Sequence, residues 1–444
     1  MKPQLLIASL SPGSGKTLLT IGLSNIMKRN GMRVQSYKCG PDFIDPLYLS
    51  VITEKDCINL DRWYSSSSHI QHIYNRYGEK SDICITEGNG GLFDGYEKTK
   101  GSCSEIAELL HIPVILLINA RGLGYSVTAM ISGFKSFNPH IKIAGVIFNQ
   151  IVSVGQYNYL RQACIDSETE CFGYIPYISD IKLPSKHSAI TINVKKNLLA
   201  MKDRISEIIS KSVDVNKILD VCNRNFPCQY ILPYSSDFED NLNIINKKLN
   251  IAVARDVAFC YLYKENLRRM SEIGNISYFS PVYSQDIPEC DILYLPAGVP
   301  ELFARQLHRR RKMLDSIKEF AEKGGKILAE GASIALLSKS LTVREDGTAY
   351  DMSGIFTFEC DTIGSKLHSG YKSIKLDGKE IKGYDYHYCN IENHIAESTT
   401  DIKQFNVKGV ELPLPIFRYK NVIASLGSLY WGENDILELW KKRN

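Results

Sequence analysis

A short stretch near the N-terminus combines residue types that can hold a nucleotide triphosphate. Gly13-Ser14-Gly15-Lys16-Thr17 follows an apolar run, Gln4 to Ala8, and precedes residues 18–23, whose apolar spacing is helical. Glycines let successive backbone N–H groups face one anion, and the positive end of the following helix adds to this attraction. Lys16 would reach the β- and γ-phosphates, and the Thr17 hydroxyl would bind Mg²⁺. A strand, a glycine-rich turn and a helix in this order favour a phosphate-binding loop over a chance turn.

The loop departs from the usual G-x-x-x-x-G-K-[ST] pattern at its first position, which is Leu10. Acidic residues follow two other predicted strands of the same half. Glu87 ends the strand 82–87, where a carboxylate that organises Mg²⁺ is expected beside a phosphate loop. Asp42 and Asp45 lie in a loop after the strand 33–38, and two prolines stiffen that loop.

These positions imply a sheet that brings them together. Helical stretches separate predicted strands at 4–8, 33–38, 82–87, 112–119 and 143–149, which indicates right-handed crossovers and a mainly parallel sheet. Ligands bind outside the carboxyl ends of such strands. Lys16, Asp42, Asp45, Glu87, Asp94 and Asn149 all lie at or just after strand ends.

The chain is predicted to contain two α/β domains, because 444 residues exceed one ordinary core. Residues 1–190 form the phosphate-loop domain. Residues 191–247 hold a helix (195–211) and a polar stretch, Cys222 to Asp240, that is typical of a linker. Residues 248–444 form a second α/β domain, with strands predicted near 248–254, 291–295, 326–330 and 422–426.

Composition narrows the function classes. Hydrophobic residues make up 44% and charged residues 23%, as in soluble globular proteins, and the net charge of +4 gives no argument for nucleic acid. The 12 cysteines are scattered without a C-x-x-C pair, and the chain starts without a signal-like segment. No apolar run approaches the roughly 20 residues of a membrane span. We therefore expect a cytoplasmic protein with reduced thiols and no membrane contact.

A series of motifs then resembles one known family. KCGPDFIDP (38–46), EGNGGLFDG (87–95), LPAGVPELFA (295–304), AEGASIALL (329–337), GYDYHY (383–388) and ASLGSLYWG (424–432) follow one another in order. Together they resemble the cobyrinic acid a,c-diamide synthase family over nearly the whole chain except the linker. That family joins an ATP-dependent amidoligase domain, similar in fold to dethiobiotin synthetase, to a class I glutamine amidotransferase domain.

The resemblance implies that ATP phosphorylates a corrinoid carboxylate and that ammonia then displaces phosphate. It implies catalytic roles for Lys16, Asp42, Asp45 and Asp94, and Mg²⁺ ligation by Thr17, Asp42 and Glu87. The alternative for each carboxylate is a cap on a helix or turn. Asn149 resembles the family's adenine-contacting position, the alternative being an Asn that merely ends a strand.

The second domain departs from the family at its glutaminase site. The family's nucleophilic Cys follows Ala-Glu on a tight turn, and here that position is Gly331. Ser428 and Tyr430 stand where the family has histidines, and Pro296 to Pro300 replaces a Gly-Gly-Tyr-Pro type turn. Without thiolate or base, glutamine hydrolysis is not expected. We expect instead that this domain helps to bind the tetrapyrrole through residues 370–372 and 383–388. His387 either contacts substrate or is a packing histidine.

Three functions remain open on the sequence alone. The first is amidation of cobyrinic acid with free or partner-supplied ammonia, which requires ATP, Mg²⁺ and a separate ammonia donor such as another glutaminase. The second is amidation of another tetrapyrrole, such as nickel sirohydrochlorin. The third is a non-catalytic paralogue that binds nucleotide and tetrapyrrole. A homodimer is neither required nor excluded by the sequence.

Overall fold

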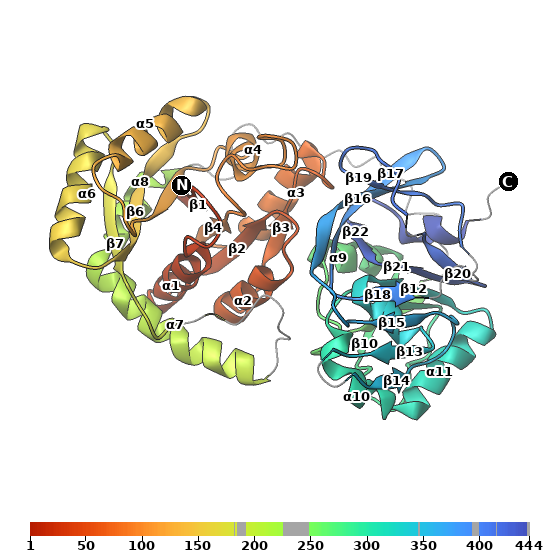
Figure 1. The fold of residues 1–444 in the computed structure, drawn as a ribbon. Helices are drawn as coiled ribbons and strands as arrows, with labels where there is room; N and C mark the ends of the chain where they lie inside the picture. The colour runs from red at the N-terminus through yellow and green to blue at the C-terminus, as the bar shows by residue number, and fades with distance from the viewer. Residues whose placement is uncertain are drawn as a thin grey trace. The chain divides into compact units, whose positions relative to one another are not determined.

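The computed structural model describes residues 1–181, 183, 192–224, 248–344, 347–392, 399–413 and 415–441. They form two compact units, the first holding the described residues up to 224 and the second those from 248 on (Figure 1). From residue 225 onward, the predicted linker lies outside the described residues. Among the helices in the described ranges, none is both long and apolar enough to cross a membrane.

The first unit is a parallel sheet with helical crossovers. Its strand order is β3-β2-β4-β1-β5-β6-β7, and β8 pairs antiparallel with β1. Its elements are β1 (Lys2–Ser9), α1 (Lys16–Arg29), β2 (Val34–Cys39), α2 (Ile44–Thr53), β3 (Ile58–Leu60), α3 (Ser67–Gly78), β4 (Ile83–Glu87), α4 (Cys103–Leu109), β5 (Val114–Asn119), α5 (Val127–Phe137), β6 (Ile143–Ile151), α6 (Val154–Asp166), β7 (Cys171–Pro176), α7 (Ile192–Ser212), α8 (Val215–Val221) and β8 (Asn223–Arg224).

The central strand β1 explains why the predicted apolar runs form this sheet. Leu5, Leu6 and Ile7 have no exposed surface, because helices cover both faces of a parallel sheet. β1 pairs in parallel with β4 on one side and β5 on the other. The ends of β1, β2 and β4 therefore lie side by side, as the strand-end argument requires.

Helix α7 packs against α1 and so belongs to the first unit, whereas the sequence placed it in a separate segment. A Cβ atom at Gly22 would lie 2.2 Å from Ile209 Cδ1 and 2.9 Å from Ile205 Cγ2, so the two helices approach closely at this glycine. Asn25 Nδ2 donates to Asp203 Oδ1 at 3.0 Å and to Ser206 Oγ at 2.8 Å. The apolar face of α7 is buried by these contacts.

The second unit has three sheets. The largest has the order β10-β9-β11-β12-β21-β20 and is parallel except for β20, and the two smaller sheets have the orders β14-β13-β15-β18 and β19-β16-β17-β22. The elements are β9 (Leu249–Ala254), α9 (Lys264–Ile273), β10 (Gly274–Phe279), β11 (Ile292–Leu295), 3₁₀ helix η2 (Pro300–Phe303), α10 (Ala304–His308), α11 (Arg311–Glu322), β12 (Lys326–Glu330), η3 (Gly331–Leu336), β13 (Ser340–Thr342), β14 (Ala349–Asp351), β15 (Glu359–Asp361), β16 (His368–Leu376), β17 (Lys379–His387), β18 (Asn390–Glu392), β19 (Gln404–Asn406), β20 (Phe417–Tyr419), β21 (Val422–Ser425), β22 (Gly427–Leu429) and η5 (Ile436–Trp440).

The α1–α7 contact predicts a stability effect. Ile209 is fully buried, so Ile209→Ala should lower the free energy of unfolding of the first unit by about 2–4 kcal/mol, through lost burial and a cavity. Chemical denaturation followed by circular dichroism measures this. The control is Leu199→Ala on the same helix, where the side chain is 36% exposed and a much smaller loss is expected. Equal losses in the two variants would contradict the packing described here.

Candidate functional site

The phosphate loop lies between β1 and α1 in the conformation that its glycines permit. Gly13 and Gly15 have positive φ angles of 73° and 97°, which residues with a Cβ atom rarely adopt. Lys16 Nζ donates to Ser9 Oγ at 2.7 Å and to the Gly90 carbonyl at 2.6 Å. Burial lowers the pKa of Lys16, and the positive charge of Lys38 adds to this effect. Bound phosphate would offer this buried ammonium a stronger, charged acceptor.

Asn149, at the end of β6, supports the phosphate loop. Its Nδ2 donates to the Ser14 carbonyl at 2.7 Å, and its Oδ1 accepts from the Gln150 N–H at 2.8 Å. A Cβ atom at position 15 would lie 2.3 Å from Asn149 Nδ2, so only glycine fits at Gly15. The structure thus gives Asn149 a role in holding the loop, and its contact with adenine stays a prediction.

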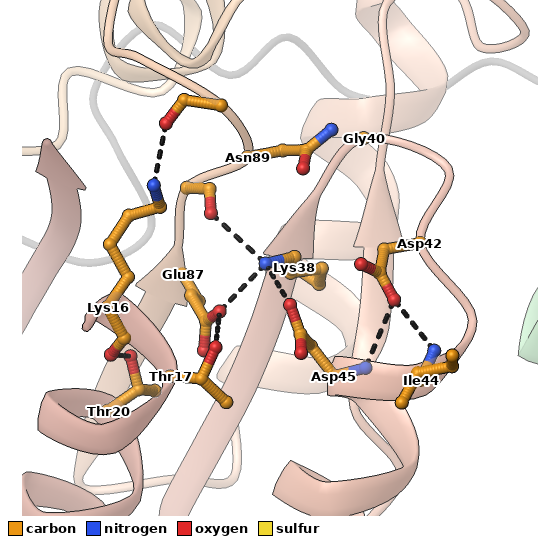
Figure 2. Close-up of polar contacts among 12 residues, drawn as sticks. Lys16, Thr17, Thr20, Lys38, Gly40, Asp42, Ile44, Asp45, Glu87 and Asn89 are labelled. Atoms are coloured by element: carbon orange, nitrogen blue, oxygen red, sulfur yellow. Dashed lines mark hydrogen bonds and ion pairs between the residues drawn. The ribbon is translucent and has the colours of Figure 1, made fainter. Parts of the chain in front are cut away.

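Lys38, the last residue but one of β2, lies at the centre of the acidic cluster (Figure 2). Its Nζ donates to Asp45 Oδ2 at 2.6 Å and to Glu87 Oε1 at 2.7 Å, and it also contacts the Gly88 carbonyl at 3.1 Å. Only 2% of the Lys38 side chain is exposed. Burial by itself would lower the pKa of Lys38, but the charges of Asp45 and Glu87 outweigh it and hold the pKa well above its usual range.

Glu87 links this lysine to the phosphate loop. Thr17 Oγ1 donates to Glu87 Oε1 at 2.8 Å (Figure 2). The other oxygen, Glu87 Oε2, is buried and has no hydrogen-bond partner among the described residues. Glu87 Oε2 and the Thr17 hydroxyl are therefore suitable oxygen ligands for a Mg²⁺ ion.

Thr17 and Glu87 alone would not complete the coordination of a Mg²⁺ ion. No group of three or more His, Cys, Asp or Glu side chains in the described ranges is arranged to hold a metal by itself. Mg²⁺ bound with a nucleotide usually takes one or two protein ligands and completes its shell with phosphate oxygens and water. Thr17 and Glu87 fit this mode.

The remaining predicted carboxylates make local backbone contacts. Asp42 Oδ1 accepts from the Ile44 N–H at 2.7 Å and the Asp45 N–H at 3.1 Å at the start of α2, as the capping alternative describes (Figure 2). Asp94 Oδ2 accepts from the Gly91 N–H at 2.9 Å, and Asp94 is exposed. These bonds fix the two side chains locally, and their catalytic and metal roles stay predictions.

Lys38 is a residue of this candidate site that sequence reasoning missed. It lies within the quoted KCGPDFIDP motif, yet no role was assigned to it. The signal was a lysine in a strand whose residues are all buried. A buried ammonium needs charged partners, so this lysine predicts an ion pair.

In the second unit, the predicted elbow is present but the space for a nucleophile is filled. Gly331 follows β12 with a positive φ of 62° and begins η3. A Cβ atom at this position would lie 2.6 Å from Ala297 Cβ and 3.6 Å from Ser428 Oγ. Ala297 stands in the turn where the family has a Gly-Gly pair, and its methyl group lies too close to admit a side chain at position 331 without a shift.

The neighbouring hydroxyl groups do not replace the missing thiol. Ser333 is fully buried, and its Oγ donates to the Pro296 carbonyl. Ser428 and Tyr430 are also buried, and Tyr430 packs edge-on against Tyr263. A cysteine nucleophile also needs a base such as histidine, and none of these hydroxyl groups can accept a proton in that way.

Residues 370–372 and 383–388, which the sequence assigned to tetrapyrrole binding, lie in and next to the hairpin β16–β17. Lys372 and Asp385 form a buried ion pair across it. His387 is 4% exposed and stacks on His368 with ring centroids 5.0 Å apart. Burial lowers the pKa of His387 to about 3, so its ring is neutral, which fits the packing alternative.

The carboxylate before the elbow is also structural. Glu330 accepts from Tyr294 Oη at 2.7 Å and from Trp431 Nε1 at 3.0 Å. Burial raises the pKa of Glu330 to about 7, although these hydrogen bonds oppose the shift. Its contacts tie β12 to β11 and to the residues after β22.

Comparison with known proteins matches both units. Residues 5–190 match the CobQ/CobB/MinD/ParA nucleotide binding domain, and residues 250–425 match the CobB/CobQ-like glutamine amidotransferase domain. A cobyrinate a,c-diamide synthase of Caldanaerobacter subterraneus is 32% identical, over 87% of this chain and 86% of that protein. Proteins of the same name from Dehalococcoides mccartyi (30% identical, 97% and 96% covered) and Saccharolobus solfataricus (31%, 96% and 98%) match at similar levels.

The Lys38 network predicts a pH-dependent stability loss. Lys38→Met leaves Asp45 and Glu87 buried without their counter-charge, so the free energy of unfolding at pH 7 should fall by about 3–5 kcal/mol. At pH 5 the deficit should shrink, because the folded variant favours the neutral, protonated carboxyl groups. Urea unfolding at both pH values measures this.

Lys100→Met is the control for this experiment. Lys100 also pairs with a carboxylate, Glu97, but both side chains are exposed, so its loss should leave the free energy of unfolding nearly unchanged. A Lys38→Met protein as stable as the wild type at pH 7 would show that the buried cation is not needed.

Proposed function

Because the chain belongs to the cobyrinate a,c-diamide synthase family, we propose that it uses ATP to convert the a- and c-acetate groups of cobyrinic acid into amides, with ammonia that it does not generate itself. The observation that carries the proposal is the contact chain from Lys38 through Glu87 to Thr17, beside the Lys16 ammonium. It joins a phosphate-binding loop to a buried acidic cluster at the ends of β2 and β4.

The chemistry requires activation of the carboxylate. An oxide is a poor leaving group, so direct attack by ammonia on the carboxylate fails. In the proposed route, a carboxylate oxygen attacks the γ-phosphorus of ATP, and the bond to the ADP oxygen breaks. Ammonia then attacks the carbonyl carbon of the acyl phosphate, phosphate leaves with the bonding electron pair, and the nitrogen loses a proton to give the amide.

The residues of the first unit serve this route by positioning and charge. Lys16 exchanges the Gly90 carbonyl for phosphate oxygens, where its charge stabilises the transferring phosphoryl group. Lys38 holds Asp45 and Glu87 in place, because both carboxylates share its ammonium. Thr17 and Glu87 would hold Mg²⁺, which neutralises charge on the β- and γ-phosphates when bound. Asp42 and Asp94 complete the proposed acidic set.

The second unit supports an external ammonia source. Gly331 provides no nucleophile, the Ala297 methyl group fills the space beside it, and buried Ser428 stands at a histidine position. The scaffold around this site is nevertheless intact. We assign it a part in binding the tetrapyrrole, with the hairpin β16–β17 as the contributing element.

The nucleotide site is tested by Lys16→Ala. With cobyrinic acid, ATP and ammonium, this variant should lose amide formation by about 100-fold or more, because the charge that Lys16 supplies to the phosphates is lost. Mass spectrometry of the corrinoid product measures it. Arg29→Ala, an exposed change at the end of the same helix, should leave turnover unchanged. Full turnover in Lys16→Ala would refute the assignment of the phosphate loop.

The ammonia source is tested by isotope competition. In the presence of ¹⁵N-ammonium and unlabelled glutamine, the amide should carry ¹⁵N, and no glutamate should accumulate. Gly331→Cys should not gain glutaminase activity, alone or with Ala297→Gly, because a base is still missing. Glutamate release in step with amide formation would contradict the proposal.

Amide-formation and binding assays with cobyrinic acid and nickel sirohydrochlorin separate the two other candidate functions. Amidation of nickel sirohydrochlorin but not of cobyrinic acid would change the substrate. Binding of both ligands without turnover would identify a non-catalytic paralogue.

A further inference from the structure

A pocket of about 390 Å³ lies beside the start of β7 in the first unit, and none of the nucleotide-site residues lines it. Two thiols line it, Cys164 from α6 and Cys171 from the first position of β7. Two basic side chains, Arg161 and Lys217, and two acidic side chains, Glu168 and Glu170, also line it. The proposed amidation uses none of these six residues.

The two thiols form a pair with unequal access to solvent. Both thiols line the same pocket, and Tyr157 Oη lies 3.7 Å from Cys171 Sγ. Cys164 is fully buried on α6, whereas Cys171 is partly exposed. A small molecule in the pocket therefore meets Cys171 as the more exposed of the two thiols that line it.

The surroundings favour the thiolate at the exposed position. The hydrogen bond from Cys164 lowers the pKa of Cys171 to about 6, and the nearby Arg161 charge acts in the same direction. The same hydrogen bond raises the pKa of Cys164, which stays protonated. At neutral pH the pair thus holds one thiolate, the nucleophilic form of cysteine, facing the pocket.

We propose that Cys171 and Cys164 form a redox-active dithiol that reacts with small disulfides entering this pocket. Arg161 offers a cationic group for a carboxylate of such a molecule, whereas Lys217 is already paired with Glu170. Cys171 is the attacking residue and Cys164 the resolving residue.

The reaction is a double thiol–disulfide exchange. The Cys171 thiolate attacks one sulfur of the small disulfide, a protein–ligand disulfide forms, and the other half leaves as a thiolate. Cys164 gives its proton to solvent and attacks Cys171 Sγ, which forms the Cys164–Cys171 disulfide and releases the second small thiol. Two protein thiols are oxidised and one disulfide is reduced to two thiols.

The test uses the reduced full chain and oxidised glutathione, followed by mass spectrometry of peptides. It is carried out in a Cys228→Ser background, because the structure does not describe that cysteine. The wild-type pair should give a Cys164–Cys171 disulfide. Cys164→Ser should instead trap glutathione on Cys171, and Cys171→Ser should lose the fast reaction.

The rate provides a second readout. The rate of the reaction at Cys171 should rise with pH around a midpoint near 6. At pH 7 this rate should be more than about tenfold higher than the rate at Cys290, a partly exposed thiol whose pKa burial raises to about 11. Arg161→Gln should slow oxidised glutathione more than the cationic disulfide cystamine. Cys290→Ser is the matched control and should leave the fast phase unchanged.

Two outcomes would overturn the proposal. One is modification of Cys171 no faster than that of Cys290. The other is a stable glutathione adduct on Cys171 in the wild type, which would show that Cys164 does not resolve it. Both readouts are independent of ATP and corrinoid, so they stand apart from the amidation assay.

Discussion

The nucleotide site depends on one buried cation. Lys38 places its ammonium between Asp45 and Glu87, and without it two carboxylates would lie in a nearly dry interior with no opposite charge. Because Glu87 also accepts from Thr17, the same cation fixes the first residues of α1. The phosphate loop, α2 and the end of β4 are thus held in register by a single charged group.

The sequence predicted five strands of the first unit, namely β1, β2, β4, β5 and β6, and a parallel sheet fixes where the ends of these strands lie. Glu87 and Thr17 do meet, at 2.8 Å. The role of Lys38 was not predicted, because its neighbours in the sequence have the pattern of an ordinary strand. Its pairing with two carboxylates becomes evident only from its burial in the structure. Asp42 and Asn149 show a related limit. The Asp42 side chain binds backbone groups of its own loop, whereas the Asn149 side chain binds the Ser14 carbonyl of the phosphate loop, and strand position alone indicates neither contact.

The sequence also did not predict the short strands or which helices pack against each other. Helix α7 was predicted, but its place against α1 depends on the close approach at Gly22, which a linear pattern does not reveal. The strand β3 and the two small sheets of the second unit consist mostly of short strands, which carry little periodicity. Residues 370–372 and 383–388 were treated as motifs, whereas they belong to and adjoin one hairpin with a buried ion pair.

The contact between position 331 and Ala297 also bears on how this chain can evolve. A reversion to cysteine at Gly331 would place its Cβ atom 2.6 Å from the Ala297 methyl group, so the first step back would cost packing and return no activity. A glycine at 297 and a histidine at 428 would each be useless until the others were present. Selection acts on one change at a time, so the Ala297 methyl group works against a single-step return of cysteine to position 331.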